Sequence, residues 1–159
     1  MKNPSKTGPQ QDRISIVLNW IKANVDEDCA KWLASLSTTI DKVLGDPTDE
    51  ESVVIGHGEF DRPLIAAFTN NDPFRTDLPP GYAIAVNDTG AFFSDNYVVA
   101  GHSGGSSQAQ VFILLHEFAH LLEAPGFKPD FESKKAGSAN DRLATKHCGK
   151  TVNNAKSIS

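Results

Sequence analysis

The segment Val111–Leu122 reads VFILLHEFAHLL and is apolar on nearly every side when it is wound as a helix. Because a helix that is hydrophobic all round must be buried, this segment predicts a central helix over about residues 107–124. Ser107, with Gln110 three residues later, is typical of a capping box at its start, and Pro125-Gly126 ends it. The rest of the chain is therefore expected to pack around this helix.

Two histidines and a glutamate interrupt the apolar run in the order His116-Glu117-Phe118-Ala119-His120. Residues at i and i+4 lie above one another on a helix, so both imidazoles point the same way and can bind one metal ion. Glu117 is offset by one residue, which lets its carboxylate reach water beside the metal and act as a general base. Two imidazoles with an oxygen donor favour a single zinc ion, Zn2+. Without a metal, a carboxylate in a buried helix costs several kcal/mol.

The HExxH pattern of His116–His120, on a buried helix that follows several strands, resembles the zincin metallopeptidases. It also resembles small bacterial secreted metallopeptidases in which a Gly-Gly stretch (Gly104-Gly105) and a Gln-Ala pair (Gln108-Ala109) precede the helix. The matching region runs from about Tyr82 to Cys148. The resemblance implies a zincin-like α+β fold with N-terminal helices, a small mixed or antiparallel twisted sheet and a buried active-site helix. It also implies one zinc ion and the hydrolysis of peptide bonds.

The third zinc ligand distinguishes the subclasses of zincins. Metzincins continue the motif with a glycine and a third histidine, and no histidine follows at that spacing here. Aspzincins use an aspartate about ten residues after the second histidine, where Asp130 lies, although their GTxDxxYG context is absent. Gluzincins use an acidic residue about twenty residues after it, close to Asp141. Asp130 is therefore the expected ligand and Asp141 the alternative, and Glu123 and His147 are weaker candidates.

Both aspartates also have a purely structural explanation. Asp130 follows Pro129, as an ordinary turn residue does. Asp141 lies three residues after Ser138 and completes the pattern of a capping box. Glu123 lies nearly two helical turns beyond His116, which is far for coordination of the same ion.

The mechanism that these residues predict is short. Zinc polarises the scissile carbonyl, and Glu117 moves a proton from the zinc-activated water to the leaving amine. The oxyanion needs a further donor, for which the candidates are Tyr82, Tyr97, His102 and His147. A strand edge near Tyr82–Asn87 is expected to align an extended peptide or protein substrate. His57, between two glycines, is expected in a flexible loop without a partner pattern.

The main alternative is a catalytically inactive domain of zincin fold that binds zinc for stability or serves as an interaction domain. The two hypotheses differ at Glu117, because a structural zinc site has no need of a carboxylate beside an open metal position. A small amidase or deformylase-like enzyme would use the same motif with an upstream cysteine ligand. The upstream cysteine is Cys29, whose place in a predicted helix disfavours that class.

A single domain, residues 12–159, is expected after a disordered leader, residues 1–11, which contains two prolines and no apolar periodicity. Apolar residues recur every three or four positions over two predicted helices, at about residues 12–24 and 29–44. Ser138–Asp141 is typical of an N-cap and predicts a last helix to about Lys146, which Gly149 ends.

The middle third of the chain predicts strands separated by turns. Short apolar runs are found at Pro63–Thr69, Tyr82–Asn87 and Gly90–Ser94, and a further short strand is expected at Val53–Ile55. Asn87–Gly90 is short enough to form a hairpin connection between antiparallel strands.

The charge balance limits the partners. Fifteen Lys and Arg against twenty Asp and Glu give a formal net charge of −5, and the pI is near 5.4. Such a chain lacks the positive field that binds nucleic acid or an acidic membrane surface. No apolar run approaches the roughly 20 residues that span a bilayer. Nucleic acid and membranes are therefore not expected as partners, and we expect a monomer that acts on peptide or protein substrates.

The two cysteines bear on stability and location. Cys29 opens one predicted helix and Cys148 closes another, which slightly favours a disulfide over two buried free thiols. A bridge across so long a loop is worth up to roughly 4–5 kcal/mol of loop-closure entropy. If the bridge forms, the protein is expected to be extracytoplasmic (secreted or periplasmic), with its signal peptide removed. Otherwise it is expected to be cytoplasmic.

Overall fold

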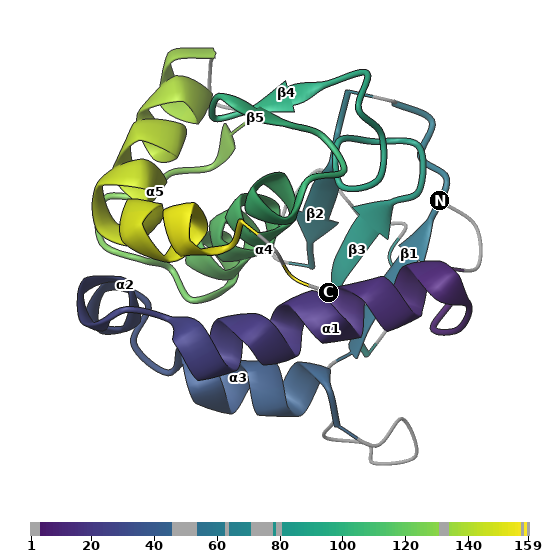
Figure 1. Ribbon diagram of the computed structural model, residues 1–159, viewed down its shortest axis with the longest axis horizontal. Coiled ribbons are helices and arrows are strands. Elements are labelled where there is room, and N and C mark those ends of the chain that lie inside the picture. Colours follow the sequence, from purple (N-terminus) through teal and green to yellow (C-terminus); the bar gives the residue numbers. More distant parts are fainter. Residues whose placement is uncertain are drawn as a thin grey trace.

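The computed structural model describes residues 4–45, 54–62, 64–70, 78, 81–130, 134–156 and 158 (Figure 1). In chain order its elements are α1 (Pro9–Asn24), α2 (Glu27–Trp32), α3 (Leu36–Val43), β1 (Val54–Gly58), β2 (Ala67–Thr69), β3 (Tyr82–Asn87), β4 (Val98–Val99), β5 (His102–Ser103), α4 (Ser107–Leu121) and α5 (Lys134–Asn154). The predicted α+β class is confirmed. Val53 and Pro63, at which two strands were expected to begin, lie outside the described residues.

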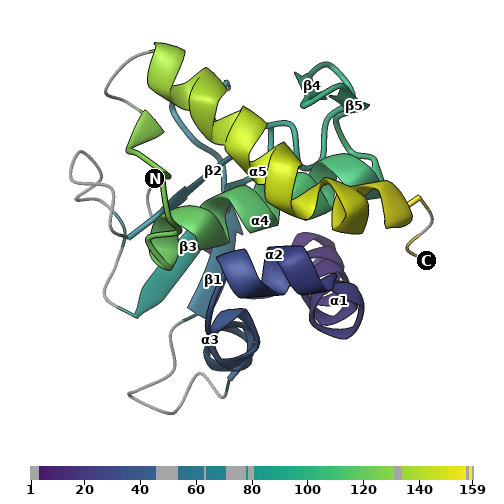
Figure 2. The ribbon, with the colours of Figure 1, turned by 90° about the vertical axis from the view of Figure 1, so that its left-hand side faces the viewer.

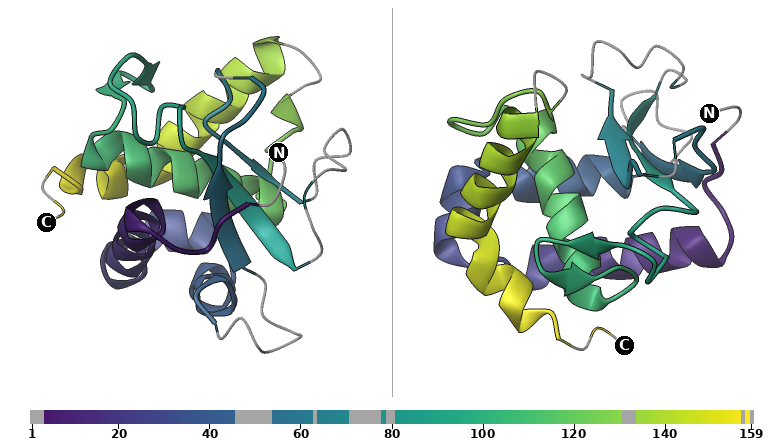
Figure 3. Two further views of the ribbon diagram at one scale, coloured as in Figure 1. Left: turned by 90° about the vertical axis from the view of Figure 1, so that its right-hand side faces the viewer. Right: turned by 90° about the horizontal axis from the view of Figure 1, so that it is seen from above.

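Helix α4 is the predicted central helix, and its apolar surface explains its position. Ten of its 15 residues are buried, Glu117 among them. It contacts α5, α1 and strand β2. Figure 2 shows α4 between α5 and the N-terminal helices, and Figure 3 shows it between α5 and the sheet. The element that carries both motif histidines is therefore held by packing on several sides.

Helix α4 begins at Ser107 as predicted, but its cap differs from the prediction. Ser106 is the N-cap, and its Oγ accepts the Ala109 N–H at 3.2 Å. The predicted capping box of Ser107 and Gln110 is wrong, because both side chains bind Arg13 of α1 instead. The Arg13 guanidinium donates to Gln110 Oε1 at 2.8 Å and to Ser107 Oγ at 3.1 Å. These contacts join residues almost a hundred positions apart, so local spacing could not predict them.

The N-terminal segment extends the ordered part of the chain. Helix α1 begins at Pro9 rather than at residue 12. Ser5 pairs with His57 of β1 through two backbone hydrogen bonds of 2.8 and 2.9 Å. The Tyr82 hydroxyl donates to the Pro4 carbonyl at 3.0 Å. From Pro4 onward, the predicted leader is therefore tied to the sheet.

The predicted helix over residues 29–44 is divided into α2 and α3. The helix is interrupted before Leu36, because Ser35 has a φ of 72°, in the left-handed region, and cannot continue a right-handed helix. The break lets α2 pack against α5 while α3 packs against α1 and β1. Two short helices thus bury apolar side chains against different partners.

The main sheet is mixed, with the strand order β1-β3-β2. β1 runs parallel to β3, with Ile55 opposite Ile84, and β2 runs antiparallel to it, with Phe68 opposite Ala85. Because β3 is paired on both sides, the expected free edge at Tyr82–Asn87 is wrong. Among the strands described, β2 forms the edge of this sheet that contacts α4.

The apolar run Gly90–Ser94 forms turns rather than a strand, and Asn87–Gly90 is not a hairpin. The fully buried side chain of Asn87 organises this region, because its Oδ1 accepts the Thr89 N–H at 3.2 Å. A Cβ on Gly104 would lie only 2.0 Å from the Ser94 carbonyl oxygen. The turns therefore pack closely against the segment that leads into α4.

Helix α5 is much longer than predicted. It runs over 21 residues from Lys134 to Asn154, so Ser138 is not a cap and Gly149 does not end it. Buried side chains continue beyond Gly149, at Thr151 and Val152. Packing of this face against α4 and α2 overrides the weak local helix propensity.

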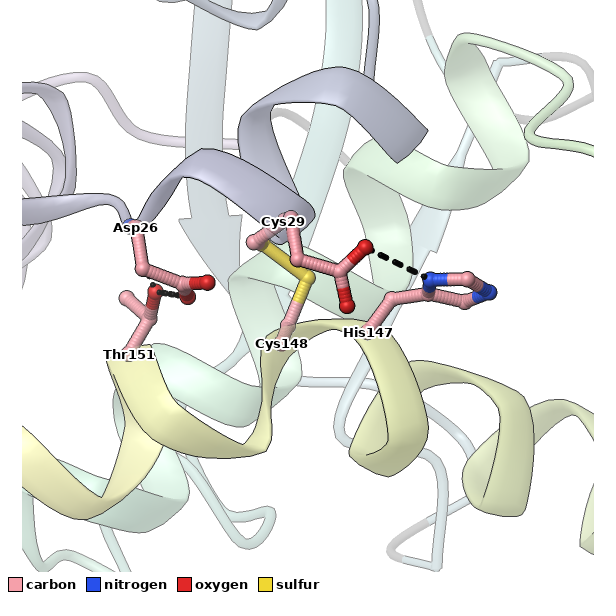
Figure 4. Close-up of a disulfide and its surroundings, with 6 residues drawn as sticks. Asp26, Cys29, His147, Cys148 and Thr151 are labelled. Atoms are coloured by element: carbon pink, nitrogen blue, oxygen red, sulfur yellow. Dashed lines mark hydrogen bonds and ion pairs between the residues drawn. A yellow bond between two sulfur atoms is a disulfide. The ribbon is translucent and has the colours of Figure 1, made fainter.

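A disulfide joins Cys29 of α2 to Cys148 of α5 (Figure 4), as the positions of the cysteines favoured. Beside it, Thr151 Oγ1 accepts the Asp26 N–H at 2.9 Å and donates to the Asp26 carboxylate. His147 Nδ1 lies 3.4 Å from the Asp28 carboxylate. Covalent and polar contacts therefore hold α2 on α5. Within the described part of the chain, no helix combines the length and apolar character needed to cross a membrane.

Candidate metal centre

The two motif histidines meet at their Nε2 atoms. His116 and His120 share one face of α4, and their Nε2 atoms lie 3.1 Å apart. Their side chains are 12% and 15% exposed, so the ring edges reach the surface although the helix is buried. The i, i+4 spacing places them as the sequence predicted.

Asp130 completes the cluster from the loop after α4. Its Oδ2 lies 2.9 Å from His116 Nε2 and 2.8 Å from His120 Nε2. Among the described residues, His116, His120 and Asp130 form a group of three potential ligands whose atoms converge. The Asp130 side chain is 46% exposed, which leaves the cluster accessible from one side.

Asp141, the alternative ligand, takes a different position. Its Oδ1 lies 3.1 Å from Nδ1 of His116, the ring nitrogen on the opposite side from Asp130. A carboxylate on the outer nitrogen of a metal-binding histidine fixes the ring orientation and raises its basicity. Asp141 lies inside α5, so the capping role with Ser138 does not occur.

The charges of the cluster shift two pKa values. Burial lowers the pKa of His116, but the hydrogen bonds to Asp130 and Asp141 and the charge of Glu117 raise it, to about 10 overall. Burial raises the pKa of Asp130, but its hydrogen bonds to His116 and His120 and their charges hold it well below its usual range. At neutral pH both shifts favour a charged pair of the His116 imidazolium and the Asp130 carboxylate.

Glu117 lies beside the two histidines in sequence and is 6% exposed. Its charge contributes to the raised pKa of His116, which indicates that its carboxylate is electrostatically coupled to the cluster. The site thus combines a buried carboxylate with a partly exposed pair of imidazoles.

An aromatic side chain that the sequence analysis missed supports both imidazoles. The ring centroid of Phe127 lies 5.0 Å from that of His116 and 4.6 Å from that of His120. Phe127 also packs edge-on against Trp32, at 5.7 Å, and Trp32 Nε1 donates to the Pro125 carbonyl at 3.2 Å. Helix α2 thus contacts the loop that carries Asp130.

Asn140 is the second residue that the sequence analysis missed, having interpreted it as part of a cap. It is 1% exposed, and its Nδ2 donates to Asp130 Oδ1 at 2.7 Å. Asn140 lies eight residues before Cys148, on the same face of α5. This spacing indicates that Asn140 is buried, but only if the helix is known to extend past Gly149.

The remaining candidates lie elsewhere or have other partners. Tyr82 binds Pro4, and His147 stacks on Trp32 with ring centroids 4.9 Å apart. His102 lies in β5, Tyr97 packs against the core, and Glu123 lies in the turn after α4 with a φ of 51°. His57 is not in a flexible loop: it lies in β1, with Nδ1 2.8 Å from the Asp88 carboxylate and Nε2 2.8 Å from the Thr7 carbonyl.

Comparisons of the chain with protein-family models, with curated proteins and with solved structures found no match.

Proposed function

We propose that this protein is a zinc-dependent metallopeptidase of zincin type, which hydrolyses peptide bonds with Glu117 as the general base. The observation that carries the proposal is the convergence of His116 Nε2, His120 Nε2 and Asp130 Oδ2 within 2.8–3.1 Å of one another. Two imidazoles and one carboxylate are the protein ligands that catalytic zinc sites use.

The donor set fits zinc in spacing as well as in kind. Bonds of 2.0–2.1 Å in a tetrahedral site put the ligand atoms about 3.3 Å apart, slightly more than the spacing found here. Asp141 supplies the outer-shell carboxylate on His116 that metal-binding histidines commonly have. The proton held by the metal-free cluster is the one that a metal ion would displace.

Each residue then has one role in hydrolysis. His116, His120 and Asp130 would hold zinc, which when bound supplies a Lewis acid for water activation and carbonyl polarisation. The Glu117 carboxylate accepts the proton of the attacking water and delivers it to the leaving amine. The partial exposure of His120 and Asp130 gives a peptide access to this side of α4.

The disulfide supports a location outside the cytoplasm. Disulfides persist in oxidising compartments, and both sulfur-bearing residues here are buried and joined. A secreted or periplasmic monomer that acts on peptides or proteins therefore completes the proposal.

The experiment combines metal analysis with peptide hydrolysis. Purified protein is loaded with zinc, its metal content is measured, and a mixture of fluorogenic peptides is used as substrate. We expect one zinc per chain, and we expect Glu117→Gln to keep the zinc and lose activity by at least about 100-fold. Glu123→Gln makes the same chemical change in the exposed turn after α4 and serves as the matched control.

Three outcomes separate the hypotheses. A wild-type protein that takes up no zinc overturns the proposal. A Glu117→Gln variant as active as the wild type overturns the role of the base. Stoichiometric zinc without hydrolysis of any peptide would favour the inactive zinc-binding domain instead.

A further inference from the structure

Both polar groups of the Asn140 side chain bind the loop that carries Asp130. Its Oδ1 accepts the Lys128 N–H at 2.9 Å, and its Nδ2 donates both to the Lys128 carbonyl and to Asp130 Oδ1. An amide has one carbonyl oxygen and two N–H donors, so every group has a partner. Turning the amide over would bring its oxygen against the Lys128 carbonyl and the Asp130 carboxylate, so a single orientation is allowed.

This contact divides the work of the two carboxylate oxygens of Asp130. Oδ1 is occupied by Asn140 at 2.7 Å, whereas Oδ2 faces His116 and His120 at 2.9 and 2.8 Å. Asp130 is half exposed and lies in a loop, so its own packing does little to restrict its rotation. The buried amide of Asn140 supplies that restriction.

Helix α5 gives Asn140 a fixed base. Asn140, Ala144 and Cys148 are spaced four residues apart and are all buried, so they lie along one face of the helix. Cys148 is bonded to Cys29 of α2. The residue that holds Asp130 is therefore two turns from a covalent anchor.

We propose that Asn140 is a positioning residue that holds Asp130 as a ligand through Oδ2 alone and so sets the affinity and coordination number of the metal site. The inference rests on the proposed zinc site and deepens it. Asn140 does not itself bind the metal. It acts by presenting one oxygen of Asp130 and withholding the other, which keeps a coordination position open for water and substrate.

Asn140→Asp tests this role while keeping part of the structural one. The new side chain still offers an oxygen to the Lys128 N–H, but it has no N–H for Asp130 Oδ1 and puts a second negative charge beside it. Asn153→Asp makes the same change at an exposed position of the same helix and is the matched control. Thermal unfolding without metal shows whether each variant is folded.

Two measurements follow for the wild type and both variants. Zinc affinity is measured by competition with a chromophoric chelator, and we expect Asn140→Asp to weaken it by about 10- to 100-fold. The visible absorption of the cobalt-substituted protein reports coordination number, and we expect Asn140→Asp to change the spectrum. Asn153→Asp should match the wild type in both.

A measurement on the wild type alone keeps the proposal testable if Asn140→Asp does not fold. X-ray absorption of the zinc-loaded protein distinguishes a carboxylate bound through one oxygen from one bound through two. One bound oxygen from a carboxylate supports the proposal, and a bidentate carboxylate overturns it.

The failures can be told apart. If the wild type binds no zinc, both the proposed function and this inference fall. If the wild type binds zinc and Asn140→Asp binds it with the same affinity and the same cobalt spectrum, the positioning role is wrong while the proposed function stands.

Discussion

Removal of the disulfide is expected to have a large effect on stability. Cys29 and Cys148 are separated by 119 residues, so their bond closes most of the chain into one loop. Loop-closure entropy for this length gives about 5 kcal/mol of stabilisation at 25 °C. The unfolding entropy of a 159-residue chain is about 0.33 kcal/mol/K. Replacing both cysteines by alanine should therefore lower the Tm by about 15 °C.

The assay is thermal unfolding followed by circular dichroism, with a chelator present because a bound metal would add stability of its own. Thr151→Val is the matched control, because it removes the bond to Asp26 between the same two helices and leaves the disulfide intact. Loss of that native contact should cost about 2 kcal/mol, or about 6 °C.

The comparison of the two variants tests the reasoning. The disulfide acts mainly by restricting the unfolded chain, whereas Thr151 acts in the folded state. If the double cysteine variant loses no more Tm than Thr151→Val, the loop-closure argument is refuted for this protein.

Two further predictions concern the cluster. In the metal-free protein, the raised pKa of His116 makes its stabilisation complete below pH 6.5 and lost as the pH rises to about 10, whereas the lowered pKa of Asp130 makes its contribution complete above pH 3.8. We expect the Tm of the chelated protein to decrease as the pH rises from 6.5 to about 10, and we expect Asp130→Asn to make this decrease smaller. A variant whose Tm decreases as steeply as that of the wild type would contradict this. Asp141→Asn removes the charge beside His116 Nδ1 and should weaken zinc binding about 10-fold in a chelator competition, where wild-type affinity would contradict the outer-shell role.

The parts of the fold that sequence predicted correctly rest on local patterns. Helix α4 was predicted because its apolar character and its boundaries lie within one segment, and the i, i+4 geometry of His116 and His120 follows from helix periodicity alone. Strand β3 was predicted with its bounds because the apolar run from Tyr82 to Asn87 ends at turn residues on both sides. Such features need no knowledge of the rest of the chain.

The parts that were missed depend on distant contacts. Gly149 indicated the end of a helix, yet burial of Thr151 and Val152 carries α5 beyond it. Gly90–Ser94 had the composition of a strand, but it forms turns, and the backbone of Gly104 packs closely against the Ser94 carbonyl of these turns. In both cases tertiary packing outweighed a local preference of about 1 kcal/mol.

The choice between Asp130 and Asp141 shows the same division at the candidate site. Both residues follow the motif at spacings that some zincins use, so spacing left the choice open. In the structure both aspartates contact His116, Asp130 at Nε2 and Asp141 at Nδ1. Both can do so because Asn140 bonds the loop of Asp130 to the helix that carries Asp141. That connection joins a loop to a helix whose length the sequence did not reveal.

Asn140 and Asp141 are neighbours in sequence but serve different residues. Successive positions on a helix point about 100° apart, so one edge of α5 can reach the Asp130 loop with one side chain and His116 with the next. Both contacts therefore depend on the position of one helix relative to α4. The disulfide at Cys148 and the packing of α5 on α4 fix that position. The disulfide that stabilises the fold by loop closure thus also helps to fix the helix on which the geometry of the cluster depends.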